Sequence, residues 1–171
     1  DASIVKVEEG IMKVAASEGD NRLGGGDLDR AIINQVMLPQ IKKNFNIDDL
    51  DDDKRKALNR LLKNEADRIK IELSFKENLD YLSDLGQFSE DADGKDIELK
   101  YIFNREEIIN LFGPYFQKSI DWAKKLIERK DLTINEIDEF ILVGGPTQIP
   151  AFRKMIEEQL KKPDTSLNAM T

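Results

Sequence analysis

Residues 140–150 combine groups that can hold an anion or a nucleotide. An apolar run with β-branched members, residues 140–143, is followed by Gly144 and Gly145 and then by a helical pattern that starts near Pro150. Glycines let the backbone approach a ligand closely, and a helix presents unpaired N–H groups at its N-terminus. The pattern therefore predicts a buried strand, a glycine turn and a helix that suit an anion or the edge of a nucleotide. The alternative is an ordinary strand-to-helix turn that binds nothing.

A second group of chemically useful side chains lies on a helical pattern over residues 54–73. The expected core face of this helix consists of Leu58, Leu61, Leu62, Ala66, Ile69 and Leu73. The opposite face carries, at helical spacing, Asp67, Lys70, Ile71 and Ser74. A carboxylate, an ammonium and a hydroxyl around one apolar side chain suit a flat ring whose edge needs hydrogen bonds, such as a purine or a ribose. The alternative is an Asp–Lys surface pair beside an isolated isoleucine.

Composition limits the remaining chemistry. The 171 residues contain no Cys and no His, and 26 Lys plus Arg against 34 Asp plus Glu give a net charge of −8. Disulfides, thiolate chemistry, His-dependent triads and the common zinc sites are therefore excluded. The acidic balance argues against nucleic acid and against an anionic membrane as partners. Because no apolar stretch could span a bilayer and no signal-peptide pattern is present, we expect a cytoplasmic protein.

Three glycines at residues 24–26 precede another helical pattern. A phosphate loop is one interpretation, but no Lys-Ser or Lys-Thr pair follows the glycines as in a Walker A loop. Asp27 and Asp29 would repel phosphate while capping the helix. We therefore favour a hinge or a close-packing role for the glycines. Pro39 is expected to kink or end this helix.

Two pairs of strands are predicted. Residues 3–7 and 11–16 read as a hairpin whose turn falls at residues 9–10, Glu-Gly. Residues 79–83 and 96–103 are expected to form a second sheet around a polar, acidic loop. The apolar residues of the hairpin could cover one face of a sheet.

Capping residues mark two further helices. Asn104 with Glu107, and Thr133 with Glu136, have the spacing of capping boxes. The first of these opens a long apolar pattern that is interrupted by Gly-Pro at residues 113–114. We expect a kink or a break of the long helix at that point.

Four motifs, in order, resemble the DnaK-type heat-shock protein 70 chaperone family. Residues 1–4 resemble the segment directly after that family's second phosphate loop, and residues 19–29 resemble its GDTHLGGEDFD signature. Residues 67–74 are similar to the bacterial EKAKIELS helix, and residues 142–150 are similar to the LVGGxTRxP turn. The resemblance spans nearly the whole chain.

The resemblance implies an α/β fold, the second lobe of an actin-like (ribonuclease H-like) ATPase domain with an inserted α+β subdomain. The core subdomain would comprise residues 1–23 and 104–171, and the inserted subdomain residues 24–103. In this family the adenosine end of ATP or ADP is held between the inserted helix and the glycine turn. The implied function is a part of a molecular chaperone whose ATP hydrolysis controls polypeptide binding during protein folding and stress response.

The resemblance also assigns roles on the inserted helix. Asp67 stands where the family has a ribose-binding Glu and is one methylene shorter. Lys70 and Ser74 match the family's residues on the sugar and the adenine, and Ile71 would lie against the adenine face.

The glycine turn departs from the family at two positions. Gly144 and Gly145 would let the backbone approach the nucleoside. Pro146 stands where family members often have Ser or Gln, and Gln148 stands where they usually have an Arg stacked on the base. Near the end of the chain, Met170 replaces an acidic residue of the family's NPDE motif. These departures predict weaker or altered nucleotide affinity.

The first residue is Asp1 rather than Met, and we expect a fragment of a longer protein. In the family, magnesium and the triphosphate sit between two lobes, with potassium as a candidate second ion, and the catalytic groups belong to the other lobe. No catalytic residue is therefore assigned here, Asp1 is the one candidate near the metal, and this polypeptide alone is expected not to hydrolyse ATP. The implied partners are the first lobe and the substrate-binding domain of the same protein, a nucleotide exchange factor and J-domain co-chaperones.

Two alternatives are of other classes. A non-enzymatic interaction module for exchange factors would expose apolar residues around residues 81–88 and 101–103. Another actin-like ATPase, such as a sugar kinase or a filament protein, shares the fold but should lack the motifs of residues 19–29 and 67–74 together.

Overall fold

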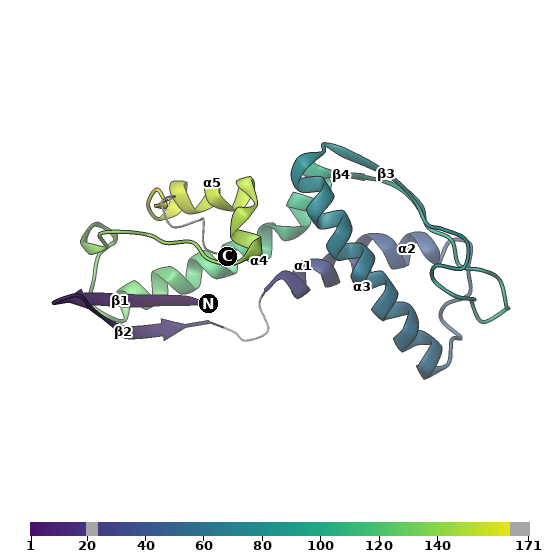
Figure 1. The fold of residues 1–171 in the computed structure, drawn as a ribbon, viewed down its shortest axis with the longest axis horizontal. Helices are drawn as coiled ribbons and strands as arrows, with labels where there is room; N and C mark the ends of the chain where they lie inside the picture. The colour runs from purple at the N-terminus through teal and green to yellow at the C-terminus, as the bar shows by residue number, and fades with distance from the viewer. Residues whose placement is uncertain (20–23, 165–171) are drawn as a thin grey trace. The chain divides into compact units, whose positions relative to one another are not determined.

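The computed structural model describes residues 1–19 and 24–164, which fall into two units of mixed α/β structure (Figure 1). One unit is formed by Asp1–Gly25 with Gly113–Thr171 and the other by Gly26–Phe112. Part of the GDTHLGGEDFD-like segment and Met170 lie outside the described residues. The division expected from the family, at residues 24 and 103, stays a prediction, because compactness alone does not identify a subdomain.

The first unit begins with the predicted hairpin. Strands β1 (Ala2–Glu8) and β2 (Ile11–Glu18) pair antiparallel, and Glu9 and Gly10 form the turn with φ values of +53° and +78°. Positive φ at both central residues defines the type I′ turn that matches the twist of the strands. The prediction of a hairpin is confirmed.

One face of the hairpin is apolar and exposed. The paired residues Val5 and Val14, and Val7 and Met12, lie on the same face because directly opposed residues of a ladder share a side of the sheet. All four side chains are exposed. These four residues share an open face, whereas Ile11, paired with Glu8, lies on the other face. That the apolar residues of the hairpin cover one face of a sheet stays a prediction.

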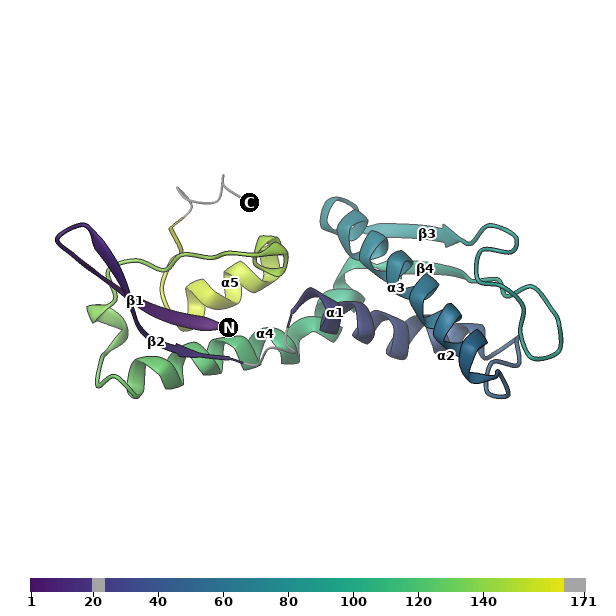
Figure 2. The ribbon, with the colours of Figure 1, turned by 60° about the horizontal axis from the view of Figure 1, so that its bottom comes forward.

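The first unit also contains α5 (Pro150–Gln159), which packs against the second half of α4 (Arg105–Glu128). Phe116 of α4 and Phe152 of α5 stack with ring centroids 4.5 Å apart and an angle of 10° between their planes. Gln117 and Gln159 exchange amide hydrogen bonds of 2.8 and 3.0 Å. Figure 2 shows the two helices side by side, as Figure 1 does.

The second unit begins with a helix that changes from α-helical to π-helical hydrogen bonding and back. The α1 helix (Gly25–Ile32) passes into a π-helix (Ile33–Met37) and then into α2 (Leu38–Ile41). Pro39 was expected to kink or end this helix, and the helix ends two residues after it. The π-helical turn just before Pro39 is a recognised site of helix distortion.

The core of the second unit lies between α3 (Asp52–Phe75) and the two-stranded sheet of β3 (Asn78–Leu82) and β4 (Lys100–Asn104). The α3 core face is confirmed, since Leu58, Leu62, Ala66, Ile69 and Leu73 are buried and Leu61 is half-buried. From the sheet, the buried rings of Tyr81 and Phe103 meet edge to face at 5.8 Å. The second sheet was predicted, although residues 96–99 precede the strand.

The capping predictions are partly confirmed. Asn104 Oδ1 accepts hydrogen bonds from the N–H groups of Glu106 and Glu107, so it caps α4 as predicted. The second hydrogen bond of a capping box would run from the Asn104 N–H to the Glu107 carboxylate. The Tyr101 hydroxyl competes for this carboxylate, to which it donates at 3.0 Å. The Thr133 box is confirmed, because the Thr133 N–H donates to Glu136 Oε2 at 2.7 Å.

Of the kink or break expected at residues 113–114, the break does not occur, because α4 continues from Arg105 to Glu128 with Pro114 inside it. The kink stays a prediction. The division between the two units nevertheless falls at this point, between Phe112 and Gly113. Among the described residues, no helix is both long enough and apolar enough to cross a bilayer.

The acidic loop between β3 and β4 is organised by a buried aspartate that the sequence did not single out. Asp91 is fully buried, and its carboxylate accepts hydrogen bonds of 2.9 Å from the backbone N–H groups of Asn46, Asp93 and Lys95. The hydrogen bond from Lys95, against the opposing effect of burial, lowers the pKa of Asp91, and those from Asn46 and Asp93 add to it. Asp91 thus ties the loop to the segment after α2.

Acidification is expected to loosen this loop. Because the pKa of Asp91 is lower in the folded than in the unfolded chain, its contribution to stability is present above the unfolded value of about 4 and is lost as pH falls through the folded value. Amide hydrogen exchange of Lys95 at falling pH measures this loss. Asp91→Asn should remove the pH dependence, because the amide does not ionise, whereas Asp80→Asn, at an exposed position, should keep it. An unchanged pH profile in Asp91→Asn would contradict the assignment.

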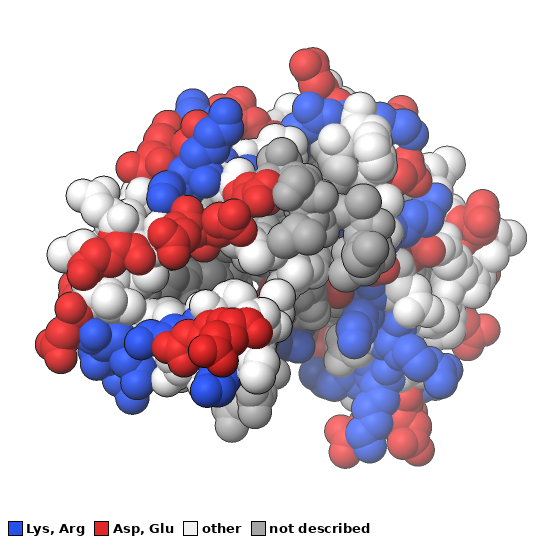
Figure 3. Space-filling view, turned by 60° about the vertical axis from the view of Figure 1, so that its left-hand side comes forward, with Lys and Arg blue, Asp and Glu red and all other residues white. Residues whose placement is uncertain are grey.

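Charged side chains of both signs share the surface. Figure 3 shows patches of Lys and Arg beside patches of Asp and Glu on the face that it presents, with neither sign continuous over it. The net charge of −8 therefore comes from a surface of mixed sign.

Candidate functional site

The strand predicted before the glycine turn is not buried. Within the described chain, residues 140–143 are held to another segment by one parallel bridge, between Ile141 and Asp164. The Asp164 N–H donates to the Phe140 carbonyl at 2.8 Å. Ile141 is 49% exposed and Val143 is 71% exposed, so the prediction of burial on both faces is wrong. A strand is buried on two faces only inside a paired and covered sheet, which these contacts do not provide.

The glycine turn and the helix after it are confirmed. Gly144 has φ +96° and ψ 155°, a conformation open almost only to glycine, and a 3₁₀ turn, Gly145–Gln148, follows it. The Thr147 N–H and hydroxyl both donate to the Gly144 carbonyl, at 3.1 and 2.7 Å. Pro150 occupies the first position of α5, where its missing N–H costs no hydrogen bond.

An arginine that the sequence did not single out supports this turn. Arg153 of α5 donates from Nε to the Thr147 carbonyl at 2.8 Å and from Nη2 to Gln148 Oε1 at 2.8 Å. Gln148 stands where the family usually has an arginine. In this chain the guanidinium that contacts the glycine turn belongs to Arg153, five residues further along the sequence. It holds the Gln148 side chain by a hydrogen bond.

Gly144→Ala is expected to lower the free energy of unfolding by about 2 kcal/mol, because a Cβ strains this backbone conformation. A Cβ at Gly144 would meet no atom within 4 Å, so the cost is conformational and not steric. Urea denaturation followed by far-UV circular dichroism measures it. The neighbouring Gly145 also has open space at its Cβ position and has no positive φ, so Gly145→Ala should change stability by less than about 0.5 kcal/mol. Equal effects of the two substitutions would refute the backbone explanation.

On α3, Lys70 lies between two carboxylates. Its ammonium donates to Asp29 Oδ1 at 2.6 Å and contacts Asp67 Oδ1 at 2.7 Å. The side chains of Asp29 and Lys70 are 7% and 15% exposed, and that of Asp67 is 54% exposed. Burial opposes the charge of Lys70, but the hydrogen bonds to Asp29 and then Asp67 outweigh it and raise the pKa of Lys70.

The expected capping role of Asp29 is therefore wrong. Its side chain crosses to α3 because, at helical spacing, Asp29 falls on the same stripe as the buried Ile32, Ile33 and Val36. A carboxylate on such a stripe must find a buried partner, and this placement is the signal that could have identified Asp29 from the sequence.

The other two predicted residues of α3 point to solvent. Ile71 is 53% exposed, and Ser74 is exposed with its hydroxyl donating to the Lys70 carbonyl at 3.1 Å. The Asp67–Lys70 pair of the alternative interpretation exists, but Lys70 is largely buried by its second partner. The structure therefore presents a fixed ammonium beside an exposed apolar side chain and a hydroxyl.

The glycines of the GDTHLGGEDFD-like segment differ in how closely other atoms approach them, and Asp1 lies against one of them. A Cβ on Gly19 would lie 1.9 Å from Asp1 Oδ1 and 2.8 Å from its Cα, so glycine allows a close approach there. Gly24 has open space, and a Cβ on Gly26 would lie 3.8 Å from Arg30 Nη1, which makes the close-packing role wrong for these two. No group of three potential metal-ligating side chains occurs within residues 1–19 and 24–164, and a metal role for Asp1 stays a prediction.

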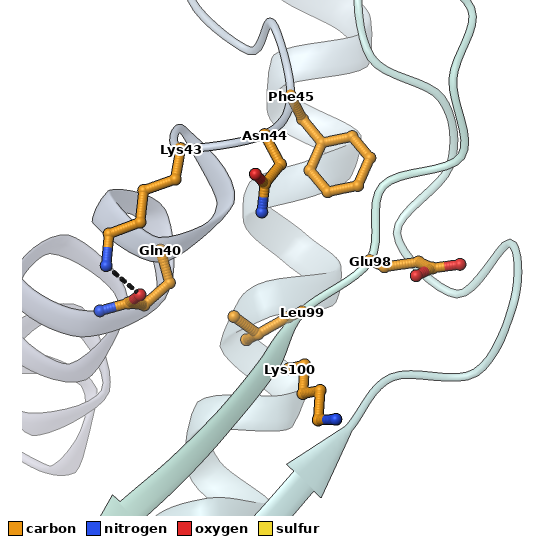
Figure 4. A pocket seen from close by; sticks show the side chains of 7 residues that line it. All are labelled: Gln40, Lys43, Asn44, Phe45, Glu98, Leu99 and Lys100. Atoms are coloured by element: carbon orange, nitrogen blue, oxygen red, sulfur yellow. Dashed lines mark hydrogen bonds between the residues drawn. The ribbon is translucent and has the colours of Figure 1, made fainter.

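Two surface crevices lie away from the predicted residues. One, of about 340 Å³, is lined by the charged residues Glu18, Lys125, Glu128 and Arg129. The other, of about 300 Å³, is shown in Figure 4, where Lys43 is hydrogen-bonded to Gln40 at the rim and Phe45 and Leu99 provide apolar surface. The predicted residues of α3 belong to the second unit, and those of the glycine turn belong to the first.

Comparison with known proteins identifies the family. The sequence model of the family described as "Hsp70 protein" matches residues 1–170. The chain belongs to the Hsp70 family. This confirms the resemblance drawn from the four motifs and sets aside a sugar kinase or a filament protein.

Several relatives share the name "Chaperone protein DnaK". The protein from Thermus thermophilus is 34% identical over 170 residues, and those from Metamycoplasma hominis and Thermotoga petrophila are 35% and 33% identical over 169 residues. Each alignment covers 98% of this Hsp70 chain and 27% of the relative. The chain thus spans about a quarter of the length of the curated Hsp70 relatives that it matches.

Proposed function

We propose that this chain holds the adenosine end of ATP or ADP, as part of the second lobe of the actin-like ATPase domain of an Hsp70 chaperone. The observation that carries the proposal is one face of α3, where the fixed and largely buried ammonium of Lys70 lies beside the exposed side chains of Ile71 and Ser74. A nucleoside presents hydroxyls on its sugar and an apolar face on its base, which is the chemistry that this face complements.

Each side chain of the face has a role in the proposal. Asp67, whose carboxylate is half exposed, accepts from a ribose hydroxyl, and the Lys70 ammonium donates to a ribose oxygen. Ile71 lies against the base, and the Ser74 hydroxyl hydrogen-bonds to the edge of the base.

The glycine turn, within the first unit, is in its own right a candidate for backbone contact with a nucleotide. The open space at the Cβ positions of Gly144 and Gly145 permits a close approach, and Pro146 limits the movement of the turn. In this proposal Gln148 replaces a stacking cation with an uncharged amide that Arg153 holds in place.

In the intact protein, ATP hydrolysis would control polypeptide binding, together with the first lobe, the substrate-binding domain, J-domain co-chaperones and an exchange factor. Magnesium, and potassium as a second ion, would be held with the phosphates. The described residues gather no group of three metal-ligating side chains, and Asp1 stays the candidate near the metal.

Calorimetric titration of the chain with adenosine, ADP and ATP tests the proposal. Ile71→Ala should weaken adenosine binding about fivefold, because truncation removes apolar contact worth about 1 kcal/mol. Ile102→Ala is the matched control, since Ile102 is 61% exposed in the same unit and lies outside the proposed site.

Equal adenosine affinity in the wild-type chain and in Ile71→Ala would argue against the site. Absence of adenosine binding by the wild-type chain would argue against an adenosine site complete within this chain. Lys70→Ala, although its position suits the proposal, is a poor first test, because it also leaves the buried Asp29 carboxylate without its partner.

An interaction surface for an exchange factor remains a second candidate. The buried Tyr81 and Phe103 argue against it, since they belong to the core. Leu82, Leu85 and Ile102, which are 65%, 77% and 61% exposed, favour it. Substituting these three residues with serine should abolish exchange-factor binding without affecting adenosine if this second function holds.

A further inference from the structure

Asp29 is the most deeply buried acidic side chain that pairs with a residue of the proposed site. Its α1 helix follows the three-glycine segment, and its carboxylate reaches Lys70 on α3 at 2.6 Å. Both helices lie in the second unit, so this contact is internal to that unit. The role proposed above for the α3 face uses Lys70 but leaves Asp29 without a function.

Burial makes this ion pair restrict the conformations of both side chains. A buried carboxylate is costly unless it is paired and hydrogen-bonded, so Asp29 and Lys70 constrain each other. The lysine side chain has many rotamers in solvent, and the buried pair selects one of them during folding. A ligand that then meets Lys70 does not have to order it, which favours binding.

The geometry also limits what the ammonium can offer a ligand. An ammonium has three N–H groups, and in the described part of the chain Lys70 directs them at Asp29 and Asp67. One N–H remains for a ligand oxygen. Because Asp67 is half exposed beside it, a donor and an acceptor are presented together, as a pair of ribose hydroxyls requires.

We propose that Asp29 is a positioning residue, which holds the Lys70 ammonium so that it and the Asp67 carboxylate face the ribose hydroxyls of a bound nucleoside. This inference rests on the proposed adenosine site. It adds to that site a buried residue of α1, which fixes the position of Lys70. Asp29 itself does not contact the ligand.

Asp29→Asn tests the proposal, because it keeps the shape of the side chain and removes the charge. Adenosine affinity, measured by calorimetry, should fall about tenfold. In ¹⁵N NMR spectra of the lysine ammonium groups, the Lys70 signal should be observable in the wild-type chain and lost by exchange broadening in the variant. Asp27→Asn is the matched control, because Asp27 lies on the same helix and pairs with Arg30. It should leave both readouts unchanged.

A double-mutant cycle separates positioning from a general structural effect. In a Lys70→Met background, Asp29→Asn should no longer reduce adenosine affinity, because the residue through which it acts is absent. If Asp29→Asn does not fold, Lys70→Arg serves instead. It keeps a cation opposite Asp29 but changes the donor geometry, so it should retain stability and lose affinity.

The outcomes distinguish this proposal from the proposed function. Unchanged affinity and an unchanged Lys70 signal in Asp29→Asn would overturn the positioning role, and so would an equal loss of affinity in the Lys70→Met background. A wild-type chain that binds no adenosine would overturn the adenosine site and with it the ribose role of Asp29. The ammonium signal would then still report whether Asp29 orders Lys70.

Discussion

Lys70→Met is expected to lower the free energy of unfolding of the second unit by about 3 kcal/mol, because removing one partner of a buried ion pair leaves the other charge uncompensated. The side chain of Asp29 is 7% exposed and pairs with Lys70 at 2.6 Å, while Asp67 is exposed enough to be solvated when Lys70 is absent. Urea denaturation followed by far-UV circular dichroism measures the change. Adenosine affinity should fall at the same time but stay measurable.

The double variant Asp29→Asn/Lys70→Met provides the control. It removes both charges, so it should recover most of the lost stability, since replacing a buried pair by uncharged groups is often close to neutral. It should not recover the lost adenosine affinity, because the ammonium is still missing. A double variant no more stable than Lys70→Met would show that the buried charge is not the cause of the destabilisation.

Phe152→Ala is expected to lower the free energy of unfolding of the first unit by about 3 kcal/mol, since it removes a buried ring and leaves a cavity. Phe152 is 7% exposed and stacks on Phe116, which attaches α5 to α4. Trp122 is the one tryptophan of the chain and belongs to the first unit, so its fluorescence during urea denaturation reports on this unit.

The same substitution should raise amide hydrogen exchange in the glycine turn. Arg153 follows Phe152 on α5 and holds Thr147 and Gln148, so a loosened α5 also loosens the turn. Phe75→Ala is the control for removing a phenyl ring, because Phe75 is 83% exposed and its loss should cost less than about 0.5 kcal/mol. Phe75 belongs to the second unit, so both variants are also followed by far-UV circular dichroism. A Phe152→Ala chain with normal stability would contradict the proposed packing.

Local patterns in the sequence were sufficient for most elements. The hairpin turn at Glu9 and Gly10, the apolar stripe of α3 and the Asn104 cap were predicted because each depends on residues close together in the chain. The glycine turn was predicted for the same reason. The family followed from four motifs in order, a signal that does not require the fold to be known.

Contacts between distant residues could not be predicted in this way. Asp29 reaches Lys70 across 41 positions, and Asp91 accepts from Asn46 across 45. From the sequence alone, a buried aspartate cannot be told from a helix cap or a solvated loop residue, because aspartate is common in all three places.

The exposure of residues 140–143 also depended on contacts with distant parts of the chain. The apolar run was evident from the sequence, but a strand is buried only where neighbouring strands and helices cover it, and Val143 is 71% exposed. The sequence by itself thus determined the local elements, the composition of the α3 face and the family. The tertiary structure decided which charges are buried and paired, because the desolvation of a charge is offset only by a partner that folding brings to it.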